Sequence, residues 1–252
     1  MALGCRPGRH TRALDTAVLV VVPTYDEAHN IGTLIERVFA TVPDAKLLVV
    51  DDGSPDGTAD LVGRLAQSEP RLHLLKRESK RGLGDSLIAG MRWGLEHGAA
   101  TIVTMDGDLS HDPTSLPTLL AASRSADLVV GSRYVTDGSI PRWNLMRRML
   151  SRGGNAYQGF MLRLGVRDAT SGYRAYSAGI LEKLDLSKAH LEGFGFQIEM
   201  VRRACSAGAS VCEVPISFTE RQMGESKIDR KTIAEALWHV TRWGVGDRLR
   251  RR

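Results

Sequence analysis

The segment VLVVVPTYDE, residues 18–27, decides the fold. Its first five residues are all apolar and Pro23 ends the run, which is the pattern of a strand buried on both faces of a parallel sheet. A helix is expected next, over residues 29–40, because the apolar residues of that stretch recur on one helical face. A buried strand, a polar turn and a helix form the unit from which α/β folds are built.

The same unit recurs along the chain. Further strands are expected at residues 46–50, 72–75, 101–105 and 128–130. Helices are expected from Thr58, which is predicted to cap its helix, and through Leu87. No Pro-, Gly- or Ser-rich linker and no internal repeat divides the sequence. We therefore predict a single α/β domain with a mostly parallel central sheet and helices on both faces.

Composition excludes several classes of protein. The 252 residues are 42% hydrophobic and 25% charged, as in an average globular chain, so disordered and collagen-like chains are excluded. No charge-free apolar run reaches about 18 residues, so we expect no membrane-spanning helix. Cys5, Cys205 and Cys212 have neither the number nor the spacing of a disulfide framework or a zinc site, which favours a reducing compartment. Residues 1–16 lack periodicity and are expected to form a disordered leader.

The net charge of +5 conceals an asymmetry between two parts of the chain. Residues 1–140 contain 14 Lys and Arg against 18 Asp and Glu, whereas residues 141–252 contain 20 against 11. The acidic part suits a cation, and the basic part suits phosphates or an anionic surface. An uneven distribution of solvated charges without any function would give the same totals. Charge alone therefore does not distinguish the two interpretations, whereas sequence motifs do.

Charged side chains follow four of the predicted strands: Asp26 and Glu27, Asp51 and Asp52, Asp106 and Asp108, and Arg133. Ligands of open α/β sheets bind beyond the carboxyl ends of the strands. Acidic groups at three such ends are hard to explain as helix caps or turns alone. The sequence has no G-x-G-x-x-G after its first strand and no P-loop, which excludes the usual dinucleotide and P-loop nucleotide sites.

Asp106 and Asp108 form the candidate metal site. In extended backbone the side chains of residues i and i+2 point the same way. Two carboxylates so placed suit Mg²⁺ or Mn²⁺ shared with a diphosphate. A lone D-x-D is more often a turn, but its position after a buried strand favours the metal. An EF-hand is excluded because His111 and Pro117 occupy the positions that need Gly and Glu.

Six segments carry a family resemblance: VVPTYDEAHNI, VVDDGSPDGT, MDGDLSHDP, GSRY, SGYR and EVPISFTERQMGESK. In this order they resemble the blocks of dolichol- and polyprenol-phosphate mannose synthases, which are inverting glycosyltransferases of the A-type fold. The resemblance extends from about Val18 to Trp243. It implies a catalytic domain over residues 17–245, with amphipathic segments near 141–152 and 229–245, and leaves a basic tail at 246–252.

The resemblance also implies a nucleotide-sugar site. Its nucleoside part would be formed by Pro23, Tyr25, Glu27, Asp52 and the backbone of Val50. The metal and the diphosphate would be bound at Asp106, Gly107, Asp108 and Ser110, and Arg133, Arg221 and Lys227 would contact phosphates or close over the donor. Some members have Gln where this chain has Ser110, so this shorter side chain would bind the metal through water. Asp106, Asp108 and Arg133 are the expected catalytic residues.

The implied reaction transfers mannose from GDP-mannose to a polyprenyl monophosphate with inversion. The acceptor phosphate is already largely dianionic at pH 7, so it needs orientation more than deprotonation. Arginines that bind phosphate bidentately would supply it: Arg133, Arg147, Arg148 and Arg152. His111, beside the acidic cluster, is expected to be structural.

The basic part of the chain suits a lipid acceptor. Residues 141–152 and 232–252 combine Trp, Leu and Met with arginines, a composition typical of segments at the headgroup boundary of an anionic bilayer. We expect a peripheral location on the cytoplasmic side of a membrane, through direct docking or a separate membrane-anchoring protein. Ordinary core-facing helices remain the alternative for both segments.

Two other functions stay open at this stage. The donor of the same reaction could be UDP-glucose, because the sequence does not indicate which nucleotide base the pocket binds. A non-catalytic sugar-nucleotide-binding subunit with the same fold is the second alternative, although the intact D-G-D motif argues against it. Nucleic acid is not expected as a partner, since no nucleic-acid-binding module accompanies the arginine-rich end.

Overall fold

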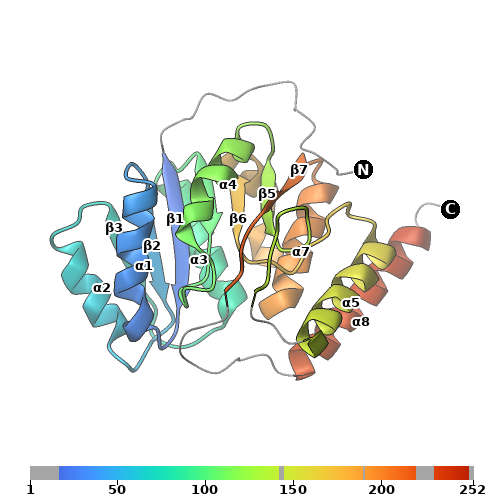
Figure 1. The fold of residues 1–252 in the computed structure, drawn as a ribbon, viewed down its shortest axis with the longest axis horizontal. Coiled ribbons are helices and arrows are strands. Elements are labelled where there is room, and N and C mark those ends of the chain that lie inside the picture. The colour runs from blue at the N-terminus through green and yellow to red at the C-terminus, as the bar shows by residue number, and fades with distance from the viewer. Residues whose placement is uncertain (1–16, 142–144, 190, 220–229, 250–252) are drawn as a thin grey trace.

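The computed structural model describes residues 17–141, 145–189, 191–219 and 230–249. They form one seven-stranded sheet with helices on both faces (Figure 1), so the predicted α/β class is confirmed. The strands are β1 (Val18–Thr24), β2 (Lys46–Asp51), β3 (Leu72–Lys76), β4 (Thr101–Thr104), β5 (Leu128–Ser132), β6 (Arg174–Ser177) and β7 (Val211–Pro215). The α-helices are α1 (Ala28–Thr41), α2 (Thr58–Ala66), α3 (Leu83–Glu96), α4 (Leu116–Ser123), α5 (Leu145–Leu162), α6 (Ala178–Lys183), α7 (Gly193–Ser206) and α8 (Arg230–Leu249).

The order of strands in the sheet is β3-β2-β1-β4-β6-β5-β7. All neighbours are parallel except β6, which runs antiparallel to both β4 and β5. The expected, mostly parallel sheet is therefore confirmed, with one reversed strand inside it. Because β1, β2, β4 and β5 run the same way, their carboxyl ends lie at one edge of the sheet, where β6 begins.

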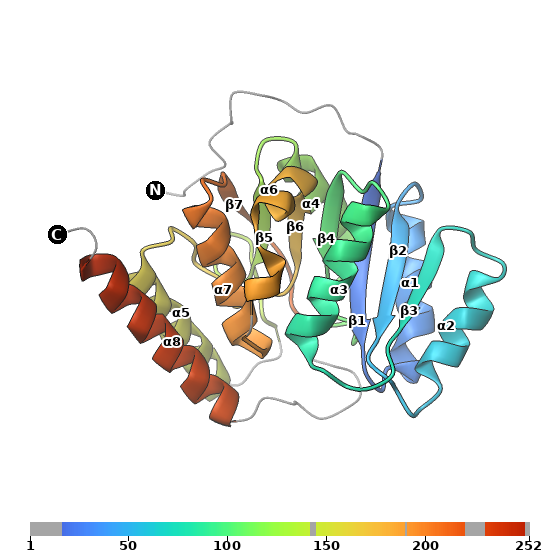
Figure 2. The ribbon, with the colours of Figure 1, turned by 180° about the vertical axis from the view of Figure 1, so that it is seen from behind.

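The alternation of side chains along the strands creates two cores. Leu19 and Val21 of β1 face one core, formed with α3, α6 and α7 on the side seen in Figure 2. Val20 and Val22 face the other core, formed with α1, α2 and α4 (Figure 1). The strands are buried from both sides, as the continuous apolar runs predicted.

Helices α5 and α8 pack against each other at the β7 end of the molecule (Figures 1 and 2), and α8 also packs on α7. Within the described ranges, the exposed large apolar side chains all belong to this pair: Leu145, Met146, Met149, Leu150 and Phe160 on α5, and Leu237, Trp238, Val245 and Leu249 on α8. In the part of the chain that the structure describes, no helix combines the length and the apolar character that crossing a bilayer requires. The leader predicted at 1–16 and the last three residues of the tail predicted at 246–252 lie outside the described residues. The first four residues of that tail belong to α8, which ends at Leu249.

Three details differ from the sequence prediction. The short strands β6 and β7 were not predicted, since four or five residues carry little periodicity. Thr58 does not cap α2 but is its first residue, preceded by Gly57 at a φ of +87°. The Thr58 hydroxyl instead donates to Asp56 and accepts from the Glu27 N–H, so it joins two turns. Strand β4 ends at Thr104 rather than at residue 105.

Candidate active site

The carboxyl edge of the sheet gathers most of the residues predicted from the sequence. The turns after β1, β2, β4 and β5 meet there because these strands are co-directional. Arg221 and Lys227, which were expected to contact phosphates, lie outside the described residues.

The turns after β1 and β2 interlock. The Asp26 N–H donates to Ser54 Oγ at 3.0 Å, and the Ala28 N–H at the start of α1 donates to Asp56 Oδ2 at 2.9 Å. Burial alone would raise the pKa of Asp56, but hydrogen bonds from Thr58 and Ala28 outweigh it and lower this pKa. An ionised Asp56 therefore caps α1 from a neighbouring loop, and the two turns form one rigid unit.

Tyr25 and Glu27, which were predicted to line a nucleoside pocket, lie in the first of these two turns. Lys80 Nζ lies 3.8 Å from the centroid of the Tyr25 ring, in cation–π geometry. Glu27 Oε2 accepts a hydrogen bond from Asn30 Nδ2 at 2.8 Å. Both side chains are half-buried, so their positions are compatible with contact to a ligand.

Asp52 anchors the loop that leads into α3. Its Oδ2 accepts hydrogen bonds from the backbone N–H groups of Arg81, at 2.8 Å, and Gly82, at 3.0 Å. Its Oδ1 lies 3.3 Å from Arg77 Nη1. Asp52 is thus hydrogen-bonded through Oδ2, whereas the buried Oδ1 has this ion-pair contact but no hydrogen bond among the described residues. The neighbouring Val50 lies inside β2, paired on both sides, with its side chain in the core.

The D-G-D motif does not have the extended geometry predicted for it. The chain bends over residues 107–109 after β4 ends at Thr104, and Leu109 adopts a φ of +62°. The extended backbone predicted for residues 106–108 is therefore wrong, and with it the reason for expecting the Asp106 and Asp108 side chains to point the same way. What brings both residues to the sheet edge is the turn, not the strand.

The two carboxylates of the motif differ in environment. The Asp108 residue is only 3% exposed, and its Oδ1 accepts the Ser110 N–H at 3.0 Å. The Asp106 side chain is 32% exposed. Between them, Gly107 lies so close to the first strand that an added Cβ would be 3.3 Å from Pro23 O. One carboxylate is thus fixed inside the turn and the other faces solvent.

The donor atoms here fit a hard divalent cation. Ser110 Oγ is buried and has no hydrogen-bond partner among the described residues, which costs about 1–3 kcal/mol unless something binds there. Asp106, Asp108 and this hydroxyl are oxygen donors of the kind that Mg²⁺ and Mn²⁺ take. Among the described residues, no group of three His, Cys, Asp or Glu side chains forms a metal site. A cation here would therefore need oxygens from substrate and water to complete its ligands.

His111 holds the turn that contains Asp106 in place. It is buried, and its Nδ1 accepts the Asp106 N–H at 3.0 Å, so this nitrogen carries no proton. Its ring stacks on Tyr173, with centroids 4.9 Å apart, and meets the edge of Phe218 at 5.5 Å. These contacts are those of a residue that fixes Asp106, as predicted for a structural histidine.

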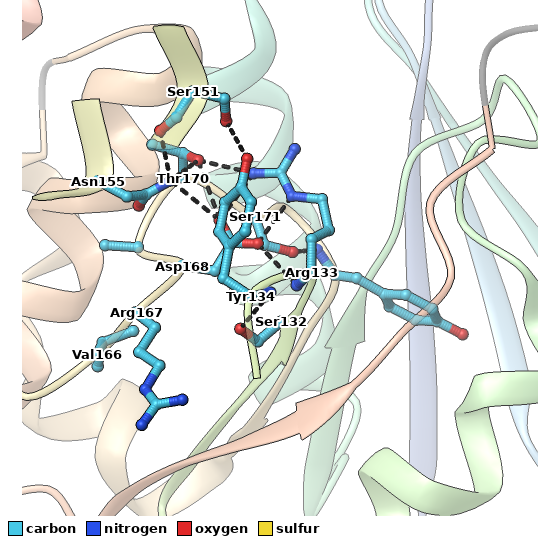
Figure 3. A network of polar contacts seen from close by, with 12 residues as sticks. Ser132, Arg133, Tyr134, Ser151, Asn155, Val166, Arg167, Asp168, Thr170 and Ser171 are labelled. Carbon is cyan, nitrogen blue, oxygen red and sulfur yellow. Dashed lines mark hydrogen bonds and ion pairs between the residues drawn. The ribbon is translucent and has the colours of Figure 1, made fainter. Parts of the chain in front are cut away.

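At the end of β5, Arg133 and Asp168 form a buried ion pair (Figure 3). Arg133 donates from Nε to Asp168 Oδ2 and from Nη2 to Oδ1, both at 2.7 Å. Burial opposes the charge on each group, but their mutual contact outweighs it: the pKa of Asp168 is lowered and the pKa of Arg133 is raised. The guanidinium edge expected to bind phosphate bidentately is therefore occupied by the buried carboxylate of Asp168.

Thr170 extends this pair towards α5 (Figure 3). Its Oγ1 accepts from Arg133 Nη2 at 2.8 Å and from Asn155 Nδ2 at 3.3 Å, and donates to Asp168 Oδ1 at 3.1 Å. On the far side, Glu213 of β7 accepts the Asp168 N–H at 2.9 Å. The network thus ties β5, β7 and α5 together at the sheet edge.

The three other arginines predicted for the acceptor phosphate lie on the first half of α5. Arg148 Nη2 donates to Ile140 O at 2.8 Å, and Arg147 is half-buried beside it. The Arg152 guanidinium carbon lies 5.8 Å from the centroid of the Tyr134 ring, which follows Arg133 at the end of β5. The structure therefore brings this helix next to the turn that carries Arg133.

One family describes this combination of fold and strand-end residues. The model of glycosyl transferase family 2 matches residues 19–185. The chain belongs to glycosyl transferase family 2. The enzyme class expected from the sequence, a glycosyltransferase, is thereby confirmed.

Two relatives of this glycosyltransferase are similar over nearly their whole length. The polyprenol monophosphomannose synthase of Mycolicibacterium smegmatis is 47% identical over 235 residues, which cover 92% of this chain and 89% of the relative. The undecaprenyl-phosphate mannosyltransferase of Micrococcus luteus is 46% identical over 231 residues, with 92% and 95% coverage. The resemblance to polyprenol-phosphate mannose synthases is confirmed.

Solved structures share the fold at low sequence identity. One is a glucosyl-3-phosphoglycerate synthase from Mycobacterium tuberculosis, in complex with Mn²⁺, UDP and glucosyl-3-phosphoglycerate. Its TM-score is 0.61 at 18% sequence identity, and the match covers 89% of this chain and 77% of the synthase chain. A mannosyltransferase from Pyrobaculum calidifontis, in complex with GDP-Man and Mn²⁺, has a TM-score of 0.54 and 19% identity, with 88% and 62% coverage. The A-type fold is thus confirmed, and both of these proteins hold a divalent metal.

Sequence reasoning missed the residues that organise the basic side of this glycosyltransferase site. Asp168, Thr170 and Asn155 were not singled out, although Asn155 stands in the segment SRGGN and Asp168 shortly precedes SGYR. Arg174, the last residue of SGYR, is fully buried and donates to the carbonyls of Ala169 and Ser171. An Asp buried beside an Arg 35 positions away leaves no periodic signal, so only the fold could pair them.

Proposed function

We propose that this glycosyltransferase transfers mannose from GDP-mannose to a polyprenyl monophosphate with inversion, which gives polyprenyl phosphate mannose. The observation that carries the proposal is the 46–47% identity, over 92% of this chain, to relatives named for polyprenol monophosphomannose synthesis and undecaprenyl-phosphate mannosyl transfer. GDP-mannose as the donor has support from the mannosyltransferase of the same fold that was crystallised with GDP-Man.

The donor nucleoside binds at the interlocked turns after β1 and β2. Tyr25 and Glu27 contribute from the first turn and Asp52 from the second, with Pro23 and the backbone of Val50 behind them. Because hydrogen bonds between the turns already order this unit, little conformational freedom is lost when the nucleotide binds.

Asp106 and Asp108 hold Mg²⁺ or Mn²⁺, with the Ser110 hydroxyl as a direct or water-mediated donor. When bound, the cation acts as a Lewis acid that stabilises the negative charge developing on the departing diphosphate. His111 fixes the Asp106 backbone, and Gly107 allows the turn to pack against β1. These contacts hold the carboxylates in place before the substrate arrives.

The acceptor needs orientation rather than a general base. A phosphate monoester loses its second proton with a pKa of about 6, so at pH 7 its oxygens are already nucleophilic. Arg147, Arg148 and Arg152 bind it from α5, and Arg133 adds a fixed positive charge. A phosphate oxygen attacks the anomeric carbon from the side opposite the diphosphate; the carbon–oxygen bond to GDP breaks, its electron pair leaves with GDP, and the configuration inverts.

The helix pair α5–α8 docks on the cytoplasmic side of a membrane, where the lipid phosphate lies at the headgroup boundary. Met146 is 80% exposed and Leu145 72%, beside the arginines of the same helix. Apolar side chains among arginines suit insertion into an anionic interface. A separate membrane-anchoring protein that covers the same face would serve the same purpose. The reaction needs no nucleic acid.

Transfer of labelled sugar to lipid tests this function. The purified chain is incubated with a short polyprenyl phosphate in detergent, Mn²⁺, and radiolabelled GDP-mannose or UDP-glucose. We expect label to enter the organic phase from GDP-mannose, and chelation to stop it. Asp108→Asn should lower kcat by about 100-fold or more, since a bound metal contributes several kcal/mol.

Asp137→Asn provides the matched control for Asp108→Asn. Asp137 is exposed after β5 at a φ of +69°, a conformation that Asn also adopts readily, so its variant should keep wild-type turnover. Label taken from UDP-glucose instead would overturn the donor assignment. Binding of GDP-mannose without turnover would favour a non-catalytic sugar-nucleotide-binding protein.

A further inference from the structure

The buried network at the end of β5 contains a residue with no role in the reaction as described so far. Asp168 is completely buried, and it receives three hydrogen bonds from Arg133: from Nε, from Nη2 and from the backbone N–H at 2.9 Å. Its own backbone N–H is held by Glu213 of β7 at 2.9 Å. The Asp168 carboxylate is therefore held by Arg133 after β5, and its backbone is held by Glu213 of β7.

The same carboxylate is joined to the acceptor helix. Thr170 donates to Asp168 and accepts from Asn155, which is buried on α5 and also donates to the Ser151 carbonyl at 3.2 Å. Figure 3 shows these side chains converging on Asp168. The helix that carries the acceptor arginines is thus connected to Arg133 through two hydrogen bonds.

Stability alone does not explain this arrangement. A buried ion pair seldom stabilises a fold more than well-packed apolar residues of the same volume, because both charges lose hydration. The ion pair does, however, hold the Arg133 guanidinium in one orientation. The Arg133 guanidinium carbon is held 5.4 Å from the centroid of the Phe218 ring and 5.5 Å from that of Tyr134, and the charge of Asp106 acts on it.

We propose that Asp168 is a positioning residue of the transfer reaction. Together with Thr170 and Asn155, it holds Arg133 in one orientation and holds α5 in register with it, so that the acceptor phosphate meets the anomeric carbon in line. The inference rests on the proposed function, because it assigns the network to the acceptor side of that reaction. A misplacement of about 1 Å at such a position can cost about 100-fold in rate.

Thr170→Val and Thr170→Ser test the proposal without removing a buried charge. Valine has the shape of threonine but cannot bridge Asn155 and Asp168, whereas serine can. We expect Thr170→Val to lower kcat/KM for polyprenyl phosphate roughly 10-fold, with KM for GDP-mannose and the Kd of GDP within about twofold of wild type. Thr170→Ser should restore most of the loss.

Asp168→Asn tests the central residue, and Asp127→Asn is its matched control. Asp127 lies just before β5, at the other end of the strand that Arg133 follows, and accepts hydrogen bonds from Ser210. Asp168→Asn should lower kcat/KM for the lipid about 100-fold while GDP still binds. Asp127→Asn should change only the melting temperature.

Each outcome decides the proposal. Wild-type acceptor kinetics in Thr170→Val would overturn it. So would losses spread equally over donor and acceptor, or a fall in melting temperature alone, since those indicate a purely structural role. If the wild-type enzyme transfers no sugar to polyprenyl phosphate, the proposed function fails and the inference falls with it; if the wild type is active and Thr170→Val behaves like it, only the inference fails.

Discussion

Helices α3 and α5 each contain three glycines, but the glycines of the two helices meet different surroundings. In α3, a Cβ added to Gly90 would lie 2.3 Å from Val21 Cγ1, and one added to Gly94 would lie 2.7 Å from Leu19 Cδ2. Around Gly153, Gly154 and Gly159 of α5, an added Cβ would meet no atom of the described residues within 4 Å. Gly90 and Gly94 allow α3 to lie directly on the sheet, whereas the three α5 glycines have open space beside them in the described structure.

The other side chains of the two helices differ in the same sense. Helix α3 buries Leu87, Ile88 and Met91, as a core helix does. Helix α5 leaves Met146 and Met149 exposed, and its buried residues include the amides Asn155 and Gln158. Large exposed apolar patches mark interaction surfaces. The comparison teaches that α3 buries its apolar side chains in the core, whereas the first half of α5 leaves its apolar side chains exposed.

Among the changes that test this difference between α3 and α5, removal of apolar side chains from α5 is expected to have the largest effect. Met146→Ser and Met149→Ser should each weaken binding to vesicles that contain anionic lipid about 10- to 100-fold, because a buried side chain of this size contributes about 1.5–3 kcal/mol. Flotation or sedimentation with vesicles measures it, and retained GDP binding checks the fold. Unchanged vesicle binding would mean that a protein, not a bilayer, covers this face.

Alanine at the two kinds of glycine should act in opposite directions. Gly90→Ala is expected to lower the free energy of unfolding by about 1–3 kcal/mol, since the added methyl group overlaps Val21 and forces the helix off the sheet. Gly153→Ala should raise it by up to about 1 kcal/mol, because alanine favours the helix and meets no neighbour. Urea denaturation of both variants measures the difference, and equal destabilisation would contradict it.

A smaller, pH-dependent effect is expected where α3 begins. Glu192 accepts the Gly84 N–H at 3.1 Å, and burial, with the nearby charges of Asp85 and Asp52, raises the pKa of Glu192 above its usual 4.5. A raised carboxyl pKa means that the folded state holds its proton longer than the unfolded state. Stability should therefore fall as pH rises from 4.5 through the folded-state pKa, by an amount specific to Glu192.

Glu192→Gln should remove that pH-dependent loss. The unfolding free energy of the variant minus that of the wild type is expected to increase with pH across this window and to stay constant above it. Denaturation at several pH values between 4 and 7 measures it, and Glu182→Gln, at an exposed position on α6, is the control. Parallel curves for Glu192→Gln and wild type would show that Glu192 titrates normally.

The sequence predicted the elements that surround the candidate site because the patterns that indicate them lie within a few neighbouring residues. The apolar run of β1 and the periodicity of α1 occupy neighbouring residues, so both elements were placed to within two residues. The acidic strand ends were also legible, since co-directional strands end at one edge. The conformation of the D-G-D motif was not predictable, because the chain bends there and Leu109 adopts a positive φ instead of the extended backbone that was expected.

The amino-acid sequence by itself determined the α/β class, the edge at which the site lies and the family to which the enzyme belongs. Only the tertiary structure decided that Arg133 is held by Asp168, that β6 is reversed between its neighbours, and that the first half of α5 exposes its Leu and Met side chains. The physical reason is the separation along the chain of the residues that interact. Periodicity and turn chemistry act between adjacent residues, whereas ion pairs, strand direction and the choice of a buried face depend on segments that meet only when the chain folds.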